Sequence, residues 1–169
     1  AVFLGNGCAS YRMGSVMHPD IQTVAVGQFD NQTDEADLAI LLRRQLSELV
    51  PRDGSLTLAT NANQADALVQ GEIIRYRPMR ASAAKLRDED ETPSDRSTYK
   101  TSIFRVQVDI RYRVVLPRQE GRVLLKDRTV TGRADFPELP DLDMSRQTGL
   151  EKDLHDASKK MVASITEAW

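Results

Sequence analysis

The chain has 169 residues, carries 23 basic and 25 acidic side chains, and is 40% apolar. A nearly neutral chain has no overall positive field to attract nucleic acid, and this apolar fraction argues against global disorder, so both classes are excluded. The length predicts one core, and no apolar stretch approaches the roughly 20 residues that a membrane-spanning helix needs, so we expect membrane contact only through a lipid anchor.

Cys8 is the only cysteine, and it follows an apolar start that ends in small residues. Residues 1–7 resemble the end of a bacterial secretory leader, which would make Cys8 a lipid-attachment site and residues 8–20 a tether. Residues 21–169 would then form a single domain outside the cytoplasm. The alternative is an ordinary cysteine near a chain end, and in either case one cysteine cannot form an internal disulfide.

The first element predicted in the body of the chain is a buried strand over residues 21–29, where Val24, Ala25 and Val26 form a continuous apolar run. Thr33 or Asp34 is then expected to cap a helix that ends at residues 51–54. A short strand is predicted over residues 55–59. The helix is expected to carry an apolar stripe of Leu38, Leu41, Leu42, Leu46 and Leu49.

A second long strand is predicted over residues 65–79, with Pro78 marking its end or an edge position. Residues 80–98 offer almost nothing to bury and are expected to form a long mobile hairpin loop. The acidic run at residues 88–91 lacks the spaced ligands and the glycine of a calcium loop, so we interpret it as solvated.

The clearest strand pattern covers residues 103–116, where apolar and polar side chains alternate. A turn at residues 117–121 and a partner strand over residues 122–132 follow, and residues 136–143 are expected to form a loop. The face predicted to pack on the core holds Phe104, Val106, Val108, Ile110, Tyr112 and Val114. The face predicted to meet water holds Arg105, Gln107, Asp109, Arg111 and Arg113.

A capping box at residues 148–151 predicts the start of a last helix. Its single apolar stripe consists of Leu150, Leu154, Ala157, Met161 and Ile165. The order of the elements predicts an α+β fold, a two-layer sandwich with two helices on one face of a mixed four- to five-stranded sheet.

The sequence offers no catalytic motif. It contains no nucleophile elbow, no phosphate-binding glycine loop and no cluster with metal-ligand spacing. His18 lies in the N-terminal segment, and His155 is expected on the surface of the last helix. We therefore predict no enzymatic activity, no cofactor and no metal site, although residues distant in sequence can converge in space.

Five stretches, in this order over nearly the whole chain, resemble the LptE family of lipopolysaccharide-assembly outer-membrane lipoproteins. They are GCASYRMG at residues 7–14, IQTVAVGQFDNQT at 21–33, ADALVQGEI at 65–73, FRVQVDIRYRVVL at 104–116 and EGRVLLKDRTVTGRADF at 120–136.

The resemblance implies a non-enzymatic protein that is lipid-anchored to the periplasmic face of the outer membrane. Its partners would be lipopolysaccharide and the β-barrel translocon LptD, which such proteins plug, help to fold and help to load. Ala9 after the lipidated cysteine is compatible with outer-membrane sorting. A mixed-charge surface would suit a plug inside a barrel lumen.

A lipopolysaccharide site would need convergent cations, preferably arginines that grip phosphate with two hydrogen bonds. The alternative is that these arginines keep the sheet face soluble or pair with Asp109 and Glu72. The candidates on two strands expected to be neighbours are Arg75, Arg77, Arg80, Arg105, Arg111 and Arg113.

Another kind of envelope lipoprotein, such as a cell-wall synthase activator or a secretion-pore component, is the alternative function. Such proteins could share a similar strand, helix and sheet core. The partner distinguishes the two functions: an outer-membrane barrel for the first, and a synthase or a ring of copies of the chain for the second.

Overall fold

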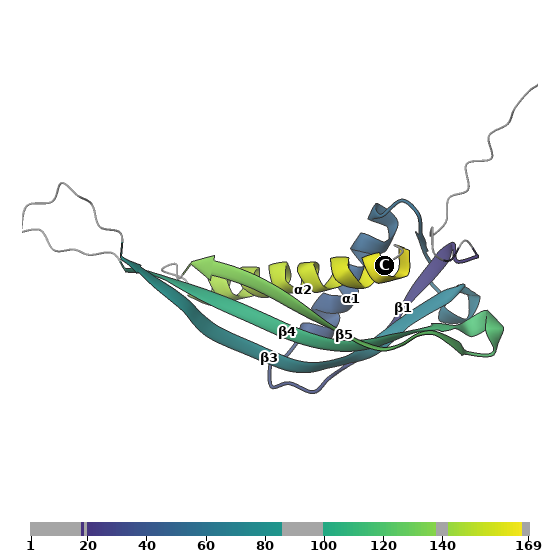
Figure 1. Ribbon diagram of the computed structural model, residues 1–169, viewed down its shortest axis with the longest axis horizontal. Helices are drawn as coiled ribbons and strands as arrows, with labels where there is room; N and C mark the ends of the chain where they lie inside the picture. The colour runs from purple at the N-terminus through teal and green to yellow at the C-terminus, as the bar shows by residue number, and fades with distance from the viewer. Residues whose placement is uncertain (1–17, 19, 86–99, 138–141, 167–169) are drawn as a thin grey trace, which may run out of the picture.

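The computed structural model describes residue 18 and residues 20–85, 100–137 and 142–166. Within these ranges the chain forms five strands and two long helices, with two short 3-10 helices (Figure 1). In chain order the elements are β1 (Thr23–Asn31), α1 (Leu38–Arg52), β2 (Thr57–Leu58), η1 (Ala62–Gln64), β3 (Ala67–Lys85), β4 (Lys100–Leu116), η2 (Pro117–Gln119), β5 (Arg122–Pro137) and α2 (Leu142–Thr166).

The five strands form one mixed sheet in the order β2-β1-β3-β4-β5. β1 pairs in parallel with β2 and β3, whereas β3, β4 and β5 pair antiparallel. A parallel pair needs a crossover connection, and α1 lies on the path from β1 to β3. The long strands β3, β4 and β5 curl beneath the helices (Figure 1).

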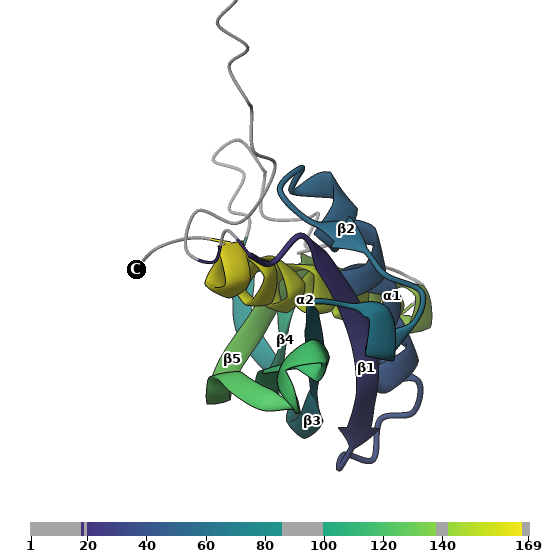
Figure 2. The same cartoon turned by 90° about the vertical axis from the view of Figure 1, so that its right-hand side faces the viewer.

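Both helices cover one face of this sheet and contact each other (Figures 1 and 2). We call the covered face the inner face and the opposite one the outer face. The apolar stripe predicted for the last helix is buried along its whole length, and so are Leu38, Leu42 and Leu46 of α1. The predicted two-layer α+β fold is therefore confirmed.

The alternation predicted for β4 is also confirmed. Its inner-face residues from Val106 to Val114 are buried, because the two helices pack on this side of the sheet. Asp109 is the exception on the outer face, since only 8% of it is exposed. A polar side chain this well covered on an uncovered sheet face must be surrounded by neighbouring side chains.

The predicted start of the first helix is wrong. α1 begins at Leu38, after Asp37 in a left-handed conformation (φ 62°) that makes no side-chain cap hydrogen bond. Thr33 instead belongs to the turn after β1, where its backbone amide donates to the Asn31 side chain at 3.1 Å. Thr33, whose residue type suggested a helix cap, forms its local hydrogen bonds in a turn instead.

The predicted start of the last helix is wrong as well, because α2 begins at Leu142 rather than at Thr148. The Thr148 hydroxyl donates to the Met144 carbonyl at 3.0 Å inside the helix. Gly149 is in the helix because of packing: a Cβ there would lie 2.4 Å from Cδ1 of Phe136.

The long strands extend further than predicted. β3 continues to Lys85, so residues 80–85 are strand rather than loop, and β5 continues through Phe136 rather than ending at Gly132. β1 ends opposite Ile73, so β3 has a neighbour on only one side at Pro78, which makes this an edge position that a proline can occupy. The acidic run at residues 88–91 lies outside the described residues.

Candidate functional site

The candidate arginines lie on two faces of the sheet. Arg105, Arg111 and Arg113 project from the outer face of β4. Residues paired directly across two strands project to the same side, so the pairing of Arg75 with Asp109 and of Arg77 with Gln107 places both arginines on the outer face too. Arg80 pairs with Phe104 and lies on the inner face, with its guanidinium carbon 5.5 Å from the Phe104 ring centroid.

Two of the outer-face arginines are engaged with carboxylates on neighbouring strands. Arg105 donates to Asp135 on β5 through Nε and Nη2, at 2.6 and 2.7 Å. Arg111 donates from Nε to Glu72 on β3 at 2.7 Å. The Arg105 guanidinium lowers the pKa of Asp135 below its ordinary value. These arginines therefore already have anionic partners within the chain.

Asp109 forms the centre of this outer-face network. Its carboxylate accepts from Thr131 at 2.8 Å and Gln107 at 3.2 Å, and it pairs with Arg77 at 3.3 Å and Arg75 at 3.9 Å. Burial alone would raise the pKa of Asp109, but these hydrogen bonds and positive charges lower it below its ordinary value. The network spans β3, β4 and β5, and its single carboxylate is shared by two more of the candidate arginines, Arg75 and Arg77.

Arg113 differs from its neighbours, because it has no carboxylate partner among the residues that the structure describes. With the Gln70 amide oxygen turned toward it, that oxygen accepts from Nη2 and Nε at 3.0 and 3.1 Å. Arg113 and Arg111 both line an outer-face groove of about 460 Å³. The other lining residues are Gln28, Asp30, Gln70, Gly71, Glu72, Tyr112 and Asp127.

The groove is polar and opens to solvent over the last residues of β1, the first part of β3 and the neighbouring stretches of β4 and β5. Its amides and its one arginine without an acidic partner can bind an anion that also carries hydroxyl groups, because each of these groups donates hydrogen bonds. Asp30, Glu72 and Asp127 would repel an anion that bound deeper. The arrangement therefore favours contact with one phosphate group near Arg113 over enclosure of a large anion.

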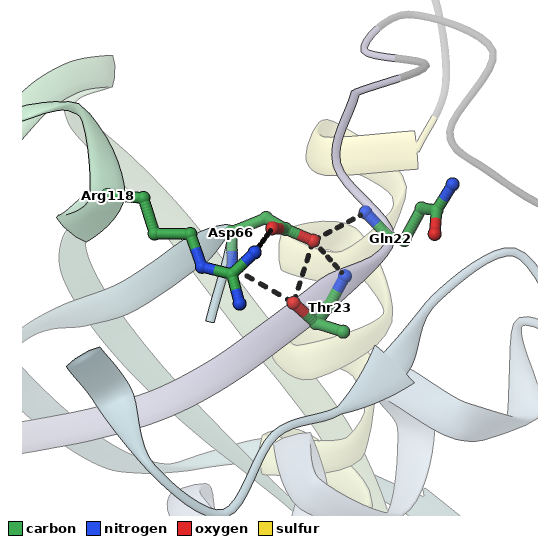
Figure 3. A network of polar contacts seen from close by, with 4 residues as sticks. All are labelled: Gln22, Thr23, Asp66 and Arg118. Atoms are coloured by element: carbon green, nitrogen blue, oxygen red, sulfur yellow. Dashed lines mark hydrogen bonds and ion pairs between the residues drawn. The ribbon is translucent and has the colours of Figure 1, made fainter. Parts of the chain in front are cut away.

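A second network joins the two sequence stretches that open β1 and β3 (Figure 3). The Asp66 carboxylate accepts from the backbone amides of Gln22 and Thr23, from the Thr23 hydroxyl at 2.7 Å and from Arg118 at 2.9 Å. Burial would raise the pKa of Asp66, but the hydrogen bonds from Thr23 and Gln22 and the charge of Arg118 lower it. Asp66 thus fastens the beginning of the domain to β3 and to the turn between β4 and β5.

Helix α2 contains a buried carboxyl group that faces the sheet. Asp153 is fully buried, and neither of its oxygens has a hydrogen bond of normal geometry among the described residues. Burial, with the nearby charge of Asp156, raises its pKa to about 8, and the Val108 amide and Lys160 offset only part of this effect. A Cβ at Gly132 would lie 2.2 Å from an Asp153 oxygen, so the carboxyl fills the space that this glycine leaves.

Sequence reasoning gave neither aspartate a role, although both left a signal. Asp66 stands between two alanines that are buried at the start of β3. Asp153 directly precedes Leu154 of the apolar stripe, at a position where a solvated charge is not expected. His155 is half-buried, and its Nδ1 lies 3.2 Å from the Gln45 amide oxygen, so it belongs to the contact between the helices. Cys8 lies outside the described residues.

Within the described ranges, no group of three or more histidine, cysteine, aspartate or glutamate side chains is placed to hold a metal ion. The helices found there are also too short or too polar to cross a membrane.

Comparison with known proteins gives one family and several similar folds. The model of the LptE family, described as lipopolysaccharide-assembly, matches residues 21–168. No curated protein matches the sequence. Similar solved structures include a minor lipoprotein from Acinetobacter baumannii (12% identity, 87% of this chain and 94% of that chain, TM-score 0.50) and the protein CT253 from Chlamydia trachomatis (11% identity, 86% and 93%, TM-score 0.52). At these identities the likeness concerns the fold alone.

Proposed function

Because the chain belongs to the LptE family of lipopolysaccharide-assembly proteins, we propose that it is a non-enzymatic outer-membrane lipoprotein that plugs an LptD-type β-barrel translocon. In this role it helps the barrel to assemble and assists the delivery of lipopolysaccharide to the cell surface. The observation that carries the proposal is the family match over residues 21–168, which includes every described helix and strand.

The outer face has properties that suit a plug. A barrel lumen is lined by polar side chains, so its occupant needs a polar surface that keeps its shape. The cross-strand contacts of Asp109, Arg105 and Arg111 set a pattern of alternating charges over three strands. Such a pattern can complement the charges of a lumen, which favours specific docking.

The anchor is the second part of the proposal. Lipidation of Cys8 would tether the domain to the periplasmic face of the outer membrane through residues 8–20. The chain then enters the sheet at β1, where Asp66 binds the amides of Gln22 and Thr23 (Figure 3). The ends of β3 and β4 at Lys85 and Lys100 lie at the opposite end of the molecule (Figure 1). The pair of strands β3 and β4 would therefore extend away from the anchor.

Arg113 is the outer-face candidate that we propose for contact with a lipopolysaccharide phosphate, with Arg111 beside it in the groove. Arg75, Arg77, Arg105 and also Arg111 would have to give up carboxylate partners to bind an anion, which weakens them as ligands relative to Arg113. Arg80 would meet the ligand only from the inner face, next to Phe104.

The first test is an affinity purification of the lipidated protein from detergent-solubilised outer membranes, with its partners identified by mass spectrometry. We expect a large β-barrel assembly protein in roughly equal amount. Recovery of a cell-wall synthase, or of the protein alone, would contradict the plug function and favour a different envelope lipoprotein.

The second test measures binding of purified lipopolysaccharide to Arg113→Ala, with Arg43→Ala as the control. Arg43 is exposed on α1, and like Arg113 it has no carboxylate partner among the described residues. We expect Arg113→Ala to weaken binding about tenfold, as the loss of one charge-assisted contact predicts. Equal affinities of the two variants would remove Arg113 from the site and leave the barrel partnership to the first test.

A further inference from the structure

β5 is the last strand of the sheet, and among the residues that the structure describes one of its edges has no neighbouring strand. Its pairing with β4 is regular from Arg128 to Pro137 and shifts register only beyond Arg128, toward Arg122. In an antiparallel pair, alternate residues direct both backbone groups away from the partner strand. A long regular edge of this kind is a template on which another strand can add.

Two side chains of α2 reach over this edge. Asp156 accepts from the Arg133 backbone amide at 3.2 Å, and Lys160 donates to the Thr131 carbonyl at 2.8 Å. Lys160 also donates to Asp156 at 2.6 Å. These contacts show that residues 131 and 133 direct their backbone groups to the free edge, and by alternation residues 129 and 135 do so too.

The Arg133 amide and the Thr131 carbonyl, which bind Asp156 and Lys160, are the backbone groups that a second copy of the chain would need for strand pairing. If two β5 strands paired antiparallel about a two-fold axis at Gly132, Thr131 of one copy would lie opposite Arg133 of the other. The Arg133 amide of each copy would then donate to the Thr131 carbonyl of its partner. Asp156 and Lys160 supply an acceptor and a donor at these two positions from within the same chain.

The side chains in this arrangement are compatible with such a pair. Thr131 would meet Arg133, and Thr129 would meet Asp135, so no like charges would lie opposite each other. The other half of β5 is less suited to strand addition, because its register shifts twice and it carries Lys126, Asp127 and Arg128 in succession.

We propose that the Asp156–Lys160 pair is a guard that closes the edge of β5, and that the edge beneath it is a self-association surface for the β5 strand of a second copy. The guard is easily displaced: the side chains of Lys160 and Asp156 are 49% and 38% exposed, and an exposed ion pair holds its geometry weakly. The guard acts through its position, because it binds the Arg133 amide and the Thr131 carbonyl, which lie at the centre of a symmetric strand pair.

The test replaces both guard residues, in an Asp156→Ala, Lys160→Ala double variant, and follows its mass by analytical ultracentrifugation over a series of concentrations. We expect the parent to remain at the monomer mass and the double variant to rise toward twice that mass as concentration increases. Hydrogen exchange should show new protection of the amides of residues 129, 131 and 135 in the dimer. The matched control, Arg44→Ala with Glu151→Ala, removes another ion pair involving α2 with the same zero change in net charge and should stay monomeric.

A third variant identifies the surface. Thr131→Pro in the double-variant background removes an amide that faces the free edge and leaves the backbone bonds to β4 in place, although it also loses the hydroxyl contact with Asp109. It should restore the monomer. A double variant that stays monomeric with unchanged exchange would overturn the proposal. So would association that survives Thr131→Pro, and so would protection of these amides without a rise in mass, which would mean that a foreign peptide occupies the edge.

Discussion

The outer sheet face and the interface between α2 and the sheet treat their buried carboxyl groups in opposite ways. On the outer face, Asp109 has four polar neighbours although it lies on the side without helices. Under α2, the Asp153 carboxyl has no hydrogen bond of normal geometry among the described residues. The contrast concerns these two carboxyl groups, because Arg77 Nε on the outer face also lacks a partner within the described ranges and the Tyr112 hydroxyl under α2 contacts the Ser164 hydroxyl at 2.7 Å.

This difference separates specificity from stability. Exposed ion pairs contribute little free energy, so the outer-face network can be altered at small cost to the fold and serves chiefly to set a charge pattern. A buried polar group without a partner costs its full desolvation free energy. The stability of the contact between α2 and the sheet is therefore sensitive to changes at Asp153, Tyr76 and Ser158. The variants below test the comparison, from the largest expected effect to the smallest.

Asp153→Asn should change the pH dependence of stability most. The pKa of Asp153 is about 8 in the folded protein, against about 3.9 in an unfolded chain. The folded state keeps a proton that the unfolded state has lost, so the free energy of unfolding falls as the pH rises from about 4 to about 8. At about 1.4 kcal/mol per unit, we expect the parent to lose about 4 kcal/mol between about pH 5 and 8 in urea denaturation, and the variant to lose little.

The carboxyl groups with lowered pKa do not interfere with this measurement. Asp66, Asp109 and Asp135 stabilise the fold above about pH 4 and lose this contribution only as the pH falls further. Equal slopes for the parent and Asp153→Asn would mean that Asp153 is ionised and has found a partner.

Gly132→Ala should destabilise the fold by about 3 kcal/mol, because the added methyl group overlaps the Asp153 carboxyl and forces α2 away from β5. Thermal unfolding followed by circular dichroism measures the loss. Thr129→Ala on the same strand is the control and should change stability by less than about 0.5 kcal/mol. A Gly132→Ala protein as stable as this control would show that α2 adjusts freely.

Asp66→Ala should cost about 2 kcal/mol, since it removes the acceptor of two backbone amides and a hydroxyl near the start of β1. Asp66 resembles Asp109 of the outer face rather than Asp153 under α2, because it is partly buried and its carboxylate has hydrogen-bond partners. Amide exchange at Gln22 and Thr23 should accelerate in the variant more than exchange in α2. Uniform acceleration would instead indicate a general loss of stability.

Glu72→Gln should have the smallest effect, less than about 1 kcal/mol, because its pair with Arg111 is at the surface. Denaturation at low and high salt provides the measurement, and the small difference from the parent should shrink as salt screens the pair. A loss above about 2 kcal/mol would show that the outer face contributes to stability as much as the inner one.

Patterns that depend on burial predicted the fold well. The alternation along residues 103–116 identified the inner face of β4, and the stripe from Leu150 to Ile165 identified the buried side of α2. These signals are reliable because they repeat over many residues and each repeat faces the same core.

Signals that depend on one or two residues predicted less. The capping box at Thr148 lies inside α2, where Gly149 packs closely against Phe136. β5 continues beyond its predicted end at Gly132, and this glycine makes room for Asp153. A glycine required by tertiary packing and one required by a turn look the same in a sequence.

The candidate site was predicted in part. The neighbouring arrangement of β3 and β4 is confirmed, and within it Arg80 projects to the inner face beside Phe104, away from Arg75 and Arg77 on the outer face. The state of each arginine depends on its cross-strand neighbour, which only the register reveals. Arg113 stands out only because an amide, Gln70, lies opposite it where Arg111 has a carboxylate, Glu72.

The contact at Gly132 sets how closely α2 can approach the sheet. A Cβ at residue 132 would lie 2.2 Å from a carboxyl oxygen of Asp153 and 2.4 Å from its backbone carbonyl oxygen, so shortening the side chain of residue 153 removes only the first overlap. Gly132→Ala should therefore remain destabilising in an Asp153→Ala background, although less so than in the parent. Residue 132 must stay a glycine for as long as the backbone of α2 keeps this distance from β5.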